Sequence, residues 1–175
     1  TLREVFDRRF YPGLGMDRED ILPVIEDFYD NVFPDLGALT AQRPEAVELV
    51  AWAFKQGFRV AVATDPFFPL KATQHRLRFA GLAPEDYPFE RVSSYETFHF
   101  TKAHAAHYAE FLGQLGWPDG PILMVGNDAE RDLAPAQHLG LATFWINTTQ
   151  PEGTGPQATG RGSLADLKAW LGQVD

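Results

Sequence analysis

The stretch Ile122-Leu-Met-Val-Gly-Asn-Asp128-Ala-Glu-Arg-Asp132 decides the fold, because an apolar run delivers two carboxylates into a tight turn. Residues 122–125 are typical of a buried strand, Gly126 of the turn that ends it, and residues 130–139 of a following helix. The carboxyl end of a strand is where open parallel α/β sheets bind ligands. Clustered oxygen ligands at that edge suit a hard divalent cation such as Mg²⁺.

An ordinary helix start is the alternative interpretation of the same carboxylates. Acidic side chains in the first turn of a helix are favoured by the helix dipole, so Asp128 and Glu130 can stand there without any ligand. The motif alone does not separate the two interpretations. Two further segments of the chain favour the ligand site.

The first of these segments is another apolar run, residues 58–63, which ends abruptly at Thr64-Asp65-Pro66 and predicts a second buried strand. Residues 44–56 have apolar side chains at helical spacing, with a proline at the start and a glycine after the end, and predict a preceding helix. A hydroxyl at the strand's carboxyl end, and the amides just beyond it, can hydrogen-bond an anionic oxygen. Capping of the next turn is the alternative role of Thr64.

The second segment begins at Lys102, and its apolar positions predict a helix over residues 102–115. A single lysine on a helix is ordinarily a solvated surface charge. Lys102, however, follows the hydroxyl of Thr64 in the chain and precedes the carboxylates of Asp128 and Asp132. A hydroxyl, an ammonium group and paired carboxylates together serve phosphoryl transfer, where positioning and charge neutralisation do most of the work.

In this order the motifs resemble those of the haloacid dehalogenase superfamily of hydrolases, over roughly residues 34–148. Thr64 stands at the superfamily's second motif, Lys102 at its third, and the Asp128 to Asp132 segment at its acidic fourth. The strings Ala63-Thr-Asp-Pro-Phe-Phe-Pro69, Arg78-Phe-Ala-Gly-Leu82 and Met124-Val-Gly-Asn-Asp128 are similar to one branch of small bacterial phosphatase-like members.

The resemblance implies an α/β fold: a three-layer Rossmann-like parallel sheet with a partial helical cap at the N-terminus. Residues 1–36 would be the remnant of the cap, and residues 37–175 the core without its first strand.

The resemblance also implies a Mg²⁺-dependent phosphatase that acts on a small phosphate monoester through an aspartyl-phosphate intermediate. Thr64, Asp65 and Lys102 would bind the phosphate, and Thr64 and Lys102 would be catalytic. Asp128 would ligate the metal directly, and Asp132 would hold the metal's water shell or the lysine. Asn127, which stands where many members carry an aspartate, would give polar support.

One motif of the superfamily is absent. These enzymes open with an apolar strand ending in Asp-x-Asp, whose carboxylates are the nucleophile and the general acid/base. No Asp-x-Asp occurs in the 175 residues, and the acidic Asp17-Arg-Glu-Asp20 follows no apolar run. We therefore expect this chain to be inactive by itself, with the nucleophile strand supplied in a complete enzyme. The alternative is a non-catalytic pseudoenzyme that serves as a ligand-sensing or protein-interaction module.

Composition excludes several other classes. The formal charge of −9 and a pI near 4.9 disfavour nucleic acid and anionic membranes as partners. No apolar run approaches the ~20 residues of a membrane span, and the absence of cysteine excludes thiol chemistry. Neither a dinucleotide-binding glycine motif nor a P-loop is present. We expect a small phosphorylated substrate, no nucleic-acid or membrane partner, and a cytoplasmic location.

Residues 1–36 predict amphipathic helices that Pro12 and Pro23, with Gly13 and Gly15, break into pieces, and their apolar faces leave a homo-oligomer open as an alternative. The remaining expected elements are a helix over residues 70–80, strands over 90–94 and 142–146, a flexible loop over 149–162, and a final helix capped by Ser163.

Overall fold

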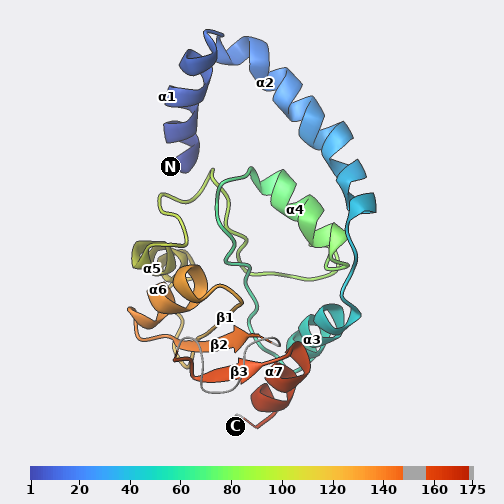
Figure 1. Ribbon diagram of the computed structural model, residues 1–175, viewed down its shortest axis with the longest axis vertical. Coiled ribbons are helices and arrows are strands. Elements are labelled where there is room, and N and C mark those ends of the chain that lie inside the picture. The colour runs from blue at the N-terminus through green and yellow to red at the C-terminus, as the bar shows by residue number, and fades with distance from the viewer. Residues whose placement is uncertain (148–156, 174–175) are drawn as a thin grey trace. The chain divides into compact units, whose positions relative to one another are not determined.

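The computed structural model describes residues 1–147 and 157–173. The chain divides into two compact units, Thr1–His99 and Phe100–Asp175. Helices make up most of the regular structure of the first unit, and the three named strands lie in the second (Figure 1).

The first unit begins with helices α1 (Leu2–Leu14) and α2 (Arg18–Asp27), followed by the π-helix η1 (Phe28–Val32) and the 3₁₀ helix η2 (Phe33–Leu39). The predicted break is confirmed at Gly15 and wrong at the two prolines, because Pro12 and Pro23 both lie inside helices. Helix α1 ends at Gly15, whose φ of 67° is left-handed. Pro23 removes one backbone hydrogen bond, and since α2 buries no residue, water can satisfy the carbonyl that loses it.

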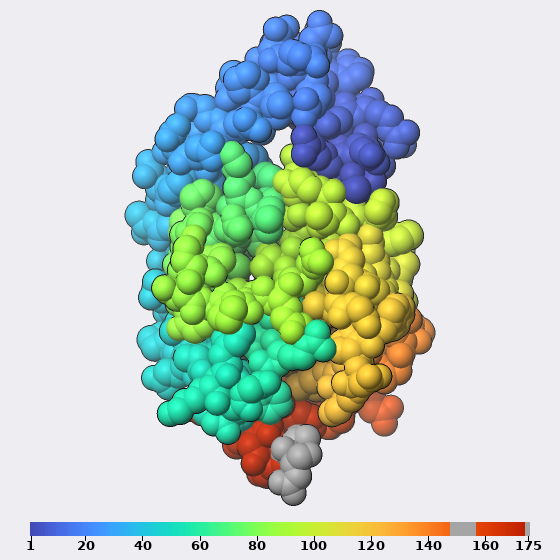
Figure 2. Space-filling view, turned by 180° about the vertical axis from the view of Figure 1, so that it is seen from behind, coloured from blue at the N-terminus to red at the C-terminus, as the bar shows by residue number. Residues whose placement is uncertain are grey.

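Large apolar side chains of these helices stay exposed. Val24, Phe28 and Val32 follow one another at intervals of four and are 66%, 42% and 49% exposed. On α1, Phe6 and Phe10 stack with ring centroids 4.4 Å apart. Figure 2 shows an opening within this unit, between the blue N-terminal helices and the green segments. The predicted apolar faces are therefore present and partly open to solvent.

The helices predicted over residues 44–56 and 70–80 are confirmed as α3 (Pro44–Lys55) and α4 (Leu70–Phe79). Proline occupies the first turn of α3, where its missing N–H has no helical partner to lose. Leu49 and Ala53, four residues apart, are the buried residues of α3.

The segments predicted as strands over residues 58–63 and 90–94 pair in parallel, as the predicted fold requires. Their pairing is shorter than predicted. Val62 and Val92 form one isolated parallel bridge. The Val62 amide donates to the Arg91 carbonyl at 2.8 Å, and the Ser93 amide donates to the Val62 carbonyl at 3.1 Å. No third strand is described in this unit, and two paired segments alone give a weak ladder.

The second unit contains a parallel three-stranded sheet in the order β1-β2-β3. β2 (Ala142–Ile146) has the predicted bounds, whereas β1 (Leu123–Gly126) lies one residue later than predicted, and β2 also pairs with β3 (Gly160–Gly162). Phe144, at the centre of β2, is 1% exposed and lies in the core. The predicted Rossmann-like α/β fold with a parallel sheet is thereby confirmed.

The predicted loop over residues 149–162 is wrong at its end, since Gly160–Gly162 forms β3. A Cβ on Gly160 would stand 2.7 Å from the ring of Phe144, so glycine permits a close approach of the two strands. Gly160, one of the glycines behind the loop prediction, is thus a glycine required by packing. Residues 149–156 of the predicted loop lie outside the described residues.

The helices of this unit are α5 (Ala105–Gln114), the π-helix η3 (Ala129–Leu133), α6 (Ala134–Gln137) and α7 (Leu164–Leu171). α6 contacts α5 and β2, and α7 contacts β3. The predicted cap of α7 is confirmed, because Ser163 forms a capping box with Asp166. Among the residues described, no helix is long and apolar enough to cross a membrane.

The start of α5 differs from the prediction. Lys102 precedes the helix, which begins only at Ala105. The His104 amide donates to the Thr101 carbonyl at 3.0 Å, so a turn separates the lysine from the helix. This turn places Lys102 in a loop at the N-terminal end of α5.

Candidate functional site

The carboxyl end of β1 leads directly into residues 127–132, here called the acidic turn. Gly126, predicted as a turn residue, is instead the last residue of β1 and pairs with Trp145. A Cβ at Gly126 would overlap the carboxylate of Asp132. Glycine at this position therefore allows the Asp132 side chain to fold back against the end of the strand.

The carboxylate of Asp132 is the centre of the acidic turn. Its Oδ2 accepts hydrogen bonds from the amides of Asn127 and Asp128, both at 3.0 Å. Its Oδ1 forms an ion pair with the Nζ of Lys102. The side chains of Asp132 and Lys102 are only 6% and 15% exposed. A buried carboxylate is costly without compensation, and here one ammonium group and two amides supply it.

Asp128 has a different environment at the front of the same turn. Its Oδ1 accepts from the amides of Glu130 and Arg131, each at 3.1 Å, so Asp128 is the N-cap of the helix that follows. The alternative interpretation, an ordinary helix start, thus explains the role of Asp128 Oδ1. Because both bonds go to Oδ1 and the residue is exposed, capping leaves the second carboxylate oxygen of Asp128 unused.

Two buried aromatic residues that the sequence analysis did not single out contact the backbone of the acidic turn. The Tyr108 hydroxyl donates to the Arg131 carbonyl at 2.8 Å, and the Trp145 Nε1 donates to the Asn127 carbonyl at 3.1 Å. Burial raises the pKa of the Tyr108 hydroxyl, and the charge of Asp132 adds to this shift. A buried tyrosine or tryptophan usually finds a hydrogen-bond partner for its polar atom. The presence of these residue types in apolar segments is therefore the sequence feature that could point to Tyr108 and Trp145.

The segment that carries Lys102 is anchored by His107. This side chain is fully buried on α5, and its Nδ1 lies 3.0 Å from the Phe100 carbonyl. Burial lowers the pKa of His107 below its usual value. The neutral imidazole therefore holds the chain on the N-terminal side of Lys102.

Thr64 and Asp65 lie in the Thr1–His99 unit, just after the parallel bridge at Val62. The Thr64 carbonyl accepts from the Ser93 hydroxyl at 2.5 Å, and Ser93 is fully buried. Thr64 and Asp65 are themselves half-buried. The carboxyl end of an extended segment is thus where the structure places the predicted hydroxyl.

The other predicted site residues lie together in the Phe100–Asp175 unit. The acidic turn contains Asn127, Asp128 and Asp132, and Lys102 is joined to it through Asp132. Asn127 takes part through its amide and its carbonyl.

The donors of the acidic turn fit Mg²⁺ with a partly retained water shell. In residues 1–147 and 157–173, no group of three or more His, Cys, Asp or Glu side chains is placed to hold a metal ion. Mg²⁺, however, usually keeps several waters and takes one or two carboxylates from the protein. The second carboxylate oxygen of Asp128, which the cap does not use, matches that requirement, whereas Asp132 is already engaged by Lys102.

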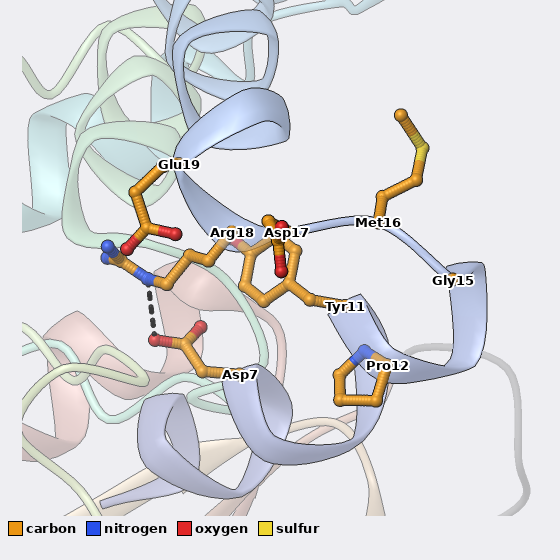
Figure 3. Close-up of a pocket in the computed structure, with 8 residues that line it drawn as sticks. All are labelled: Asp7, Tyr11, Pro12, Gly15, Met16, Asp17, Arg18 and Glu19. Atoms are coloured by element: carbon orange, nitrogen blue, oxygen red, sulfur yellow. Dashed lines mark hydrogen bonds and ion pairs between the residues drawn. The ribbon is translucent and has the colours of Figure 1, made fainter.

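A hollow of about 440 Å³ lies elsewhere, at the corner between α1 and α2 (Figure 3). Arg18 donates to the carboxylate of Asp7 at 3.2 Å across this corner, beside the buried ring of Tyr11. None of the predicted site residues lines this hollow.

Comparison with known proteins identifies the family. A family model for haloacid dehalogenase-like hydrolases matches residues 7–140. The pyrimidine 5′-nucleotidase YjjG of Escherichia coli (strain K12) is 35% identical over 132 residues, which are 73% of this chain and 56% of that protein. The chain thus spans little more than half the length of this relative.

Solved structures show the same fold. A HAD phosphatase from Thermococcus onnurineus aligns with a TM-score of 0.66 at 20% identity, over 98% of this chain and 90% of its own. The HAD hydrolase YfnB from Bacillus subtilis, bound to magnesium, aligns with a TM-score of 0.61 at 22% identity, over 74% of this chain and 55% of its own. Together with the match of the family model, this likeness confirms the resemblance that the motifs carry: the chain belongs to the haloacid dehalogenase-like hydrolases.

Proposed function

We propose that the complete protein is a Mg²⁺-dependent phosphatase that hydrolyses a small phosphate monoester through an aspartyl-phosphate intermediate. One observation carries the proposal: Asp132 holds Lys102 and two amides beside an exposed Asp128 at the carboxyl end of β1. Positive charge and oxygen ligands at one strand end are what phosphoryl transfer requires. A cytoplasmic location belongs to the same proposal.

Five of the six predicted site residues take a direct part in this proposal. Lys102 neutralises charge on the phosphoryl group, and Asp132 fixes the position of that lysine. Asp128 ligates Mg²⁺, which when bound would neutralise charge on the phosphoryl oxygens. Thr64 and the amide of Asp65 would hydrogen-bond the phosphate.

The 175 residues contain no Asp-x-Asp. In the proposed reaction a carboxylate oxygen attacks phosphorus, the bond to the substrate's ester oxygen breaks, and water then releases phosphate from the aspartyl group. This chain offers no carboxylate in the nucleophile's place. We therefore expect it to be inactive by itself.

One curated relative suggests which substrate class to test first. YjjG is named a pyrimidine 5′-nucleotidase. Nucleoside 5′-monophosphates are therefore the first substrates to test, beside p-nitrophenyl phosphate as a general phosphate ester.

The test compares the product of the complete coding sequence with the 175-residue chain. The complete protein should release phosphate with Mg²⁺ and lose this activity on chelation, and the 175-residue chain should release none. Turnover by the 175-residue chain that Asp128→Asn abolishes would refute its inactivity. A complete protein that lacks Asp-x-Asp and releases no phosphate would favour the non-catalytic ligand-sensing module.

A further inference from the structure

Two aromatic side chains hold the main chain of the acidic turn from different elements. Tyr108 lies on α5 and donates to the Arg131 carbonyl, whereas Trp145 lies in β2 and donates to the Asn127 carbonyl. Tyr108 is 3% exposed and Trp145 is 4% exposed. A buried donor that loses its acceptor keeps the full cost of desolvation, so both hydrogen bonds should be retained.

The two carbonyls that accept these bonds stand at the two ends of the turn. Asn127 immediately precedes the cap residue Asp128, and Arg131 immediately precedes Asp132. Because the aromatic residues bind backbone atoms, they set the course of the turn without using the carboxylates. Asp132 can then bind Lys102, and the second oxygen of Asp128 can face solvent.

The Tyr108 bond also fixes the lysine relative to the turn. Lys102 and Tyr108 belong to one segment, and they contact the adjacent residues Asp132 and Arg131. On the other side, the guanidinium of Arg161 lies 5.0 Å from the centre of the Trp145 ring and packs over it. The ring of Trp145 is therefore itself held in place.

We propose that Tyr108 and Trp145 are positioning residues that hold the acidic turn in the geometry that binds a divalent cation. The cation in this statement rests on the proposed function. The positioning of the turn by the two hydrogen bonds can be measured without any cation.

The first test is amide hydrogen exchange in the 175-residue chain, followed by NMR without added metal. Tyr108→Phe removes one hydroxyl and keeps the ring. The amides of Asn127 and Asp128, which bond to Asp132, should exchange about fivefold faster or more. The matched control is Tyr87→Phe, whose ring packs against Phe54 and Phe89 in the other unit and whose change should leave these two amides unaffected.

Unchanged exchange of both amides in folded Tyr108→Phe would overturn the role of the tyrosine. Trp145→Phe tests the other end of the turn in the same way, and it decides the question if Tyr108→Phe does not fold. A merely structural side chain would lower the melting temperature without a selective change at these two amides.

The second test is a titration with Mg²⁺ alone, read from the amide shifts of the acidic turn. Tyr108→Phe should raise the Kd about fivefold relative to Tyr87→Phe, at a temperature where both are folded. An equal Kd in a variant whose amides exchange faster would overturn the link to cation binding. If the unchanged chain shows no Mg²⁺ shift, the cation site of the proposed function is wrong, and the exchange experiment still judges the positioning.

Discussion

The ammonium group of Lys102 pairs with the carboxylate of Asp132 where both side chains are largely shielded from water, at 15% and 6% exposure. The pair between Lys71 and Asp30 has 36% and 54% exposure at a distance of 2.7 Å. The two pairs share their chemistry and differ in burial and in the two amides that also bind Asp132. They therefore form a natural internal comparison.

Asp132→Asn should lower the free energy of unfolding by about 3 kcal/mol, because it leaves the largely buried ammonium group of Lys102 without a counter-charge. Asp30→Asn should cost less than about 1 kcal/mol, because water screens that exposed pair. Urea denaturation of the two variants measures the difference. Equal losses would show that burial of the Lys102 pair contributes nothing.

Gly126→Ala should destabilise the protein by about 2 kcal/mol, because the new Cβ would occupy the space of the Asp132 carboxylate. Gly113→Ala is the matched control. Gly113 is exposed in α5, and its added Cβ would meet only Trp117 at 3.6 Å, an ordinary contact. This control should gain about 0.5–1 kcal/mol from the helix propensity of alanine. Thermal melts of both variants test the opposite signs, and a loss of similar size in both would contradict the role of Gly126.

The pH dependence of stability should contain a contribution from His107, whose pKa is lowered by burial from the ordinary value of 6.5. Between the lowered folded pKa and 6.5, the unfolded chain binds more protons, so stability rises with pH and is lost as the pH falls below about 6.5. His107→Gln removes this term. The stability advantage of the unchanged protein over this variant should be larger at pH 7.5 than at pH 5.5, and a constant difference would contradict the assignment.

The sequence predicts the second unit best where one strong local pattern acts alone. β2 matches its predicted bounds, and β1 is displaced by one residue, because each is an apolar run between turn signals. β3 was missed because Gly160 is a glycine for packing against Phe144, which composition cannot distinguish from a loop glycine. The break predicted at Pro23 does not occur, because the cost of a proline inside a helix depends on burial and α2 buries no residue.

For the candidate site, the sequence predicts which residues to examine and not how they are held. Asp132 and Lys102 were named, yet the back-folding of Asp132 onto two amides depends on the absence of a side chain at Gly126. Tyr108 and Trp145 act through main-chain carbonyls, and no side-chain motif records such contacts. The order and spacing of residues along the chain show which chemical groups the site can use. The contacts that hold those groups form only when the chain packs.

Asp128→Asn separates capping from cation binding at the front of the turn. Asparagine caps helices as well as aspartate, so without metal the stability should change by less than about 0.5 kcal/mol. The unchanged protein should gain about 2.7 kcal/mol when Mg²⁺ is present at a hundred times its Kd, because binding favours the folded state. Asp128→Asn should lose most of that gain, since an amide oxygen carries no charge for the cation.

The exposed Asp119, changed to Asn, serves as the control for a general loss of negative charge and should keep the full gain. Denaturation curves with Mg²⁺ and with EDTA give all these values, and an undiminished gain in Asp128→Asn would remove Asp128 from the metal site.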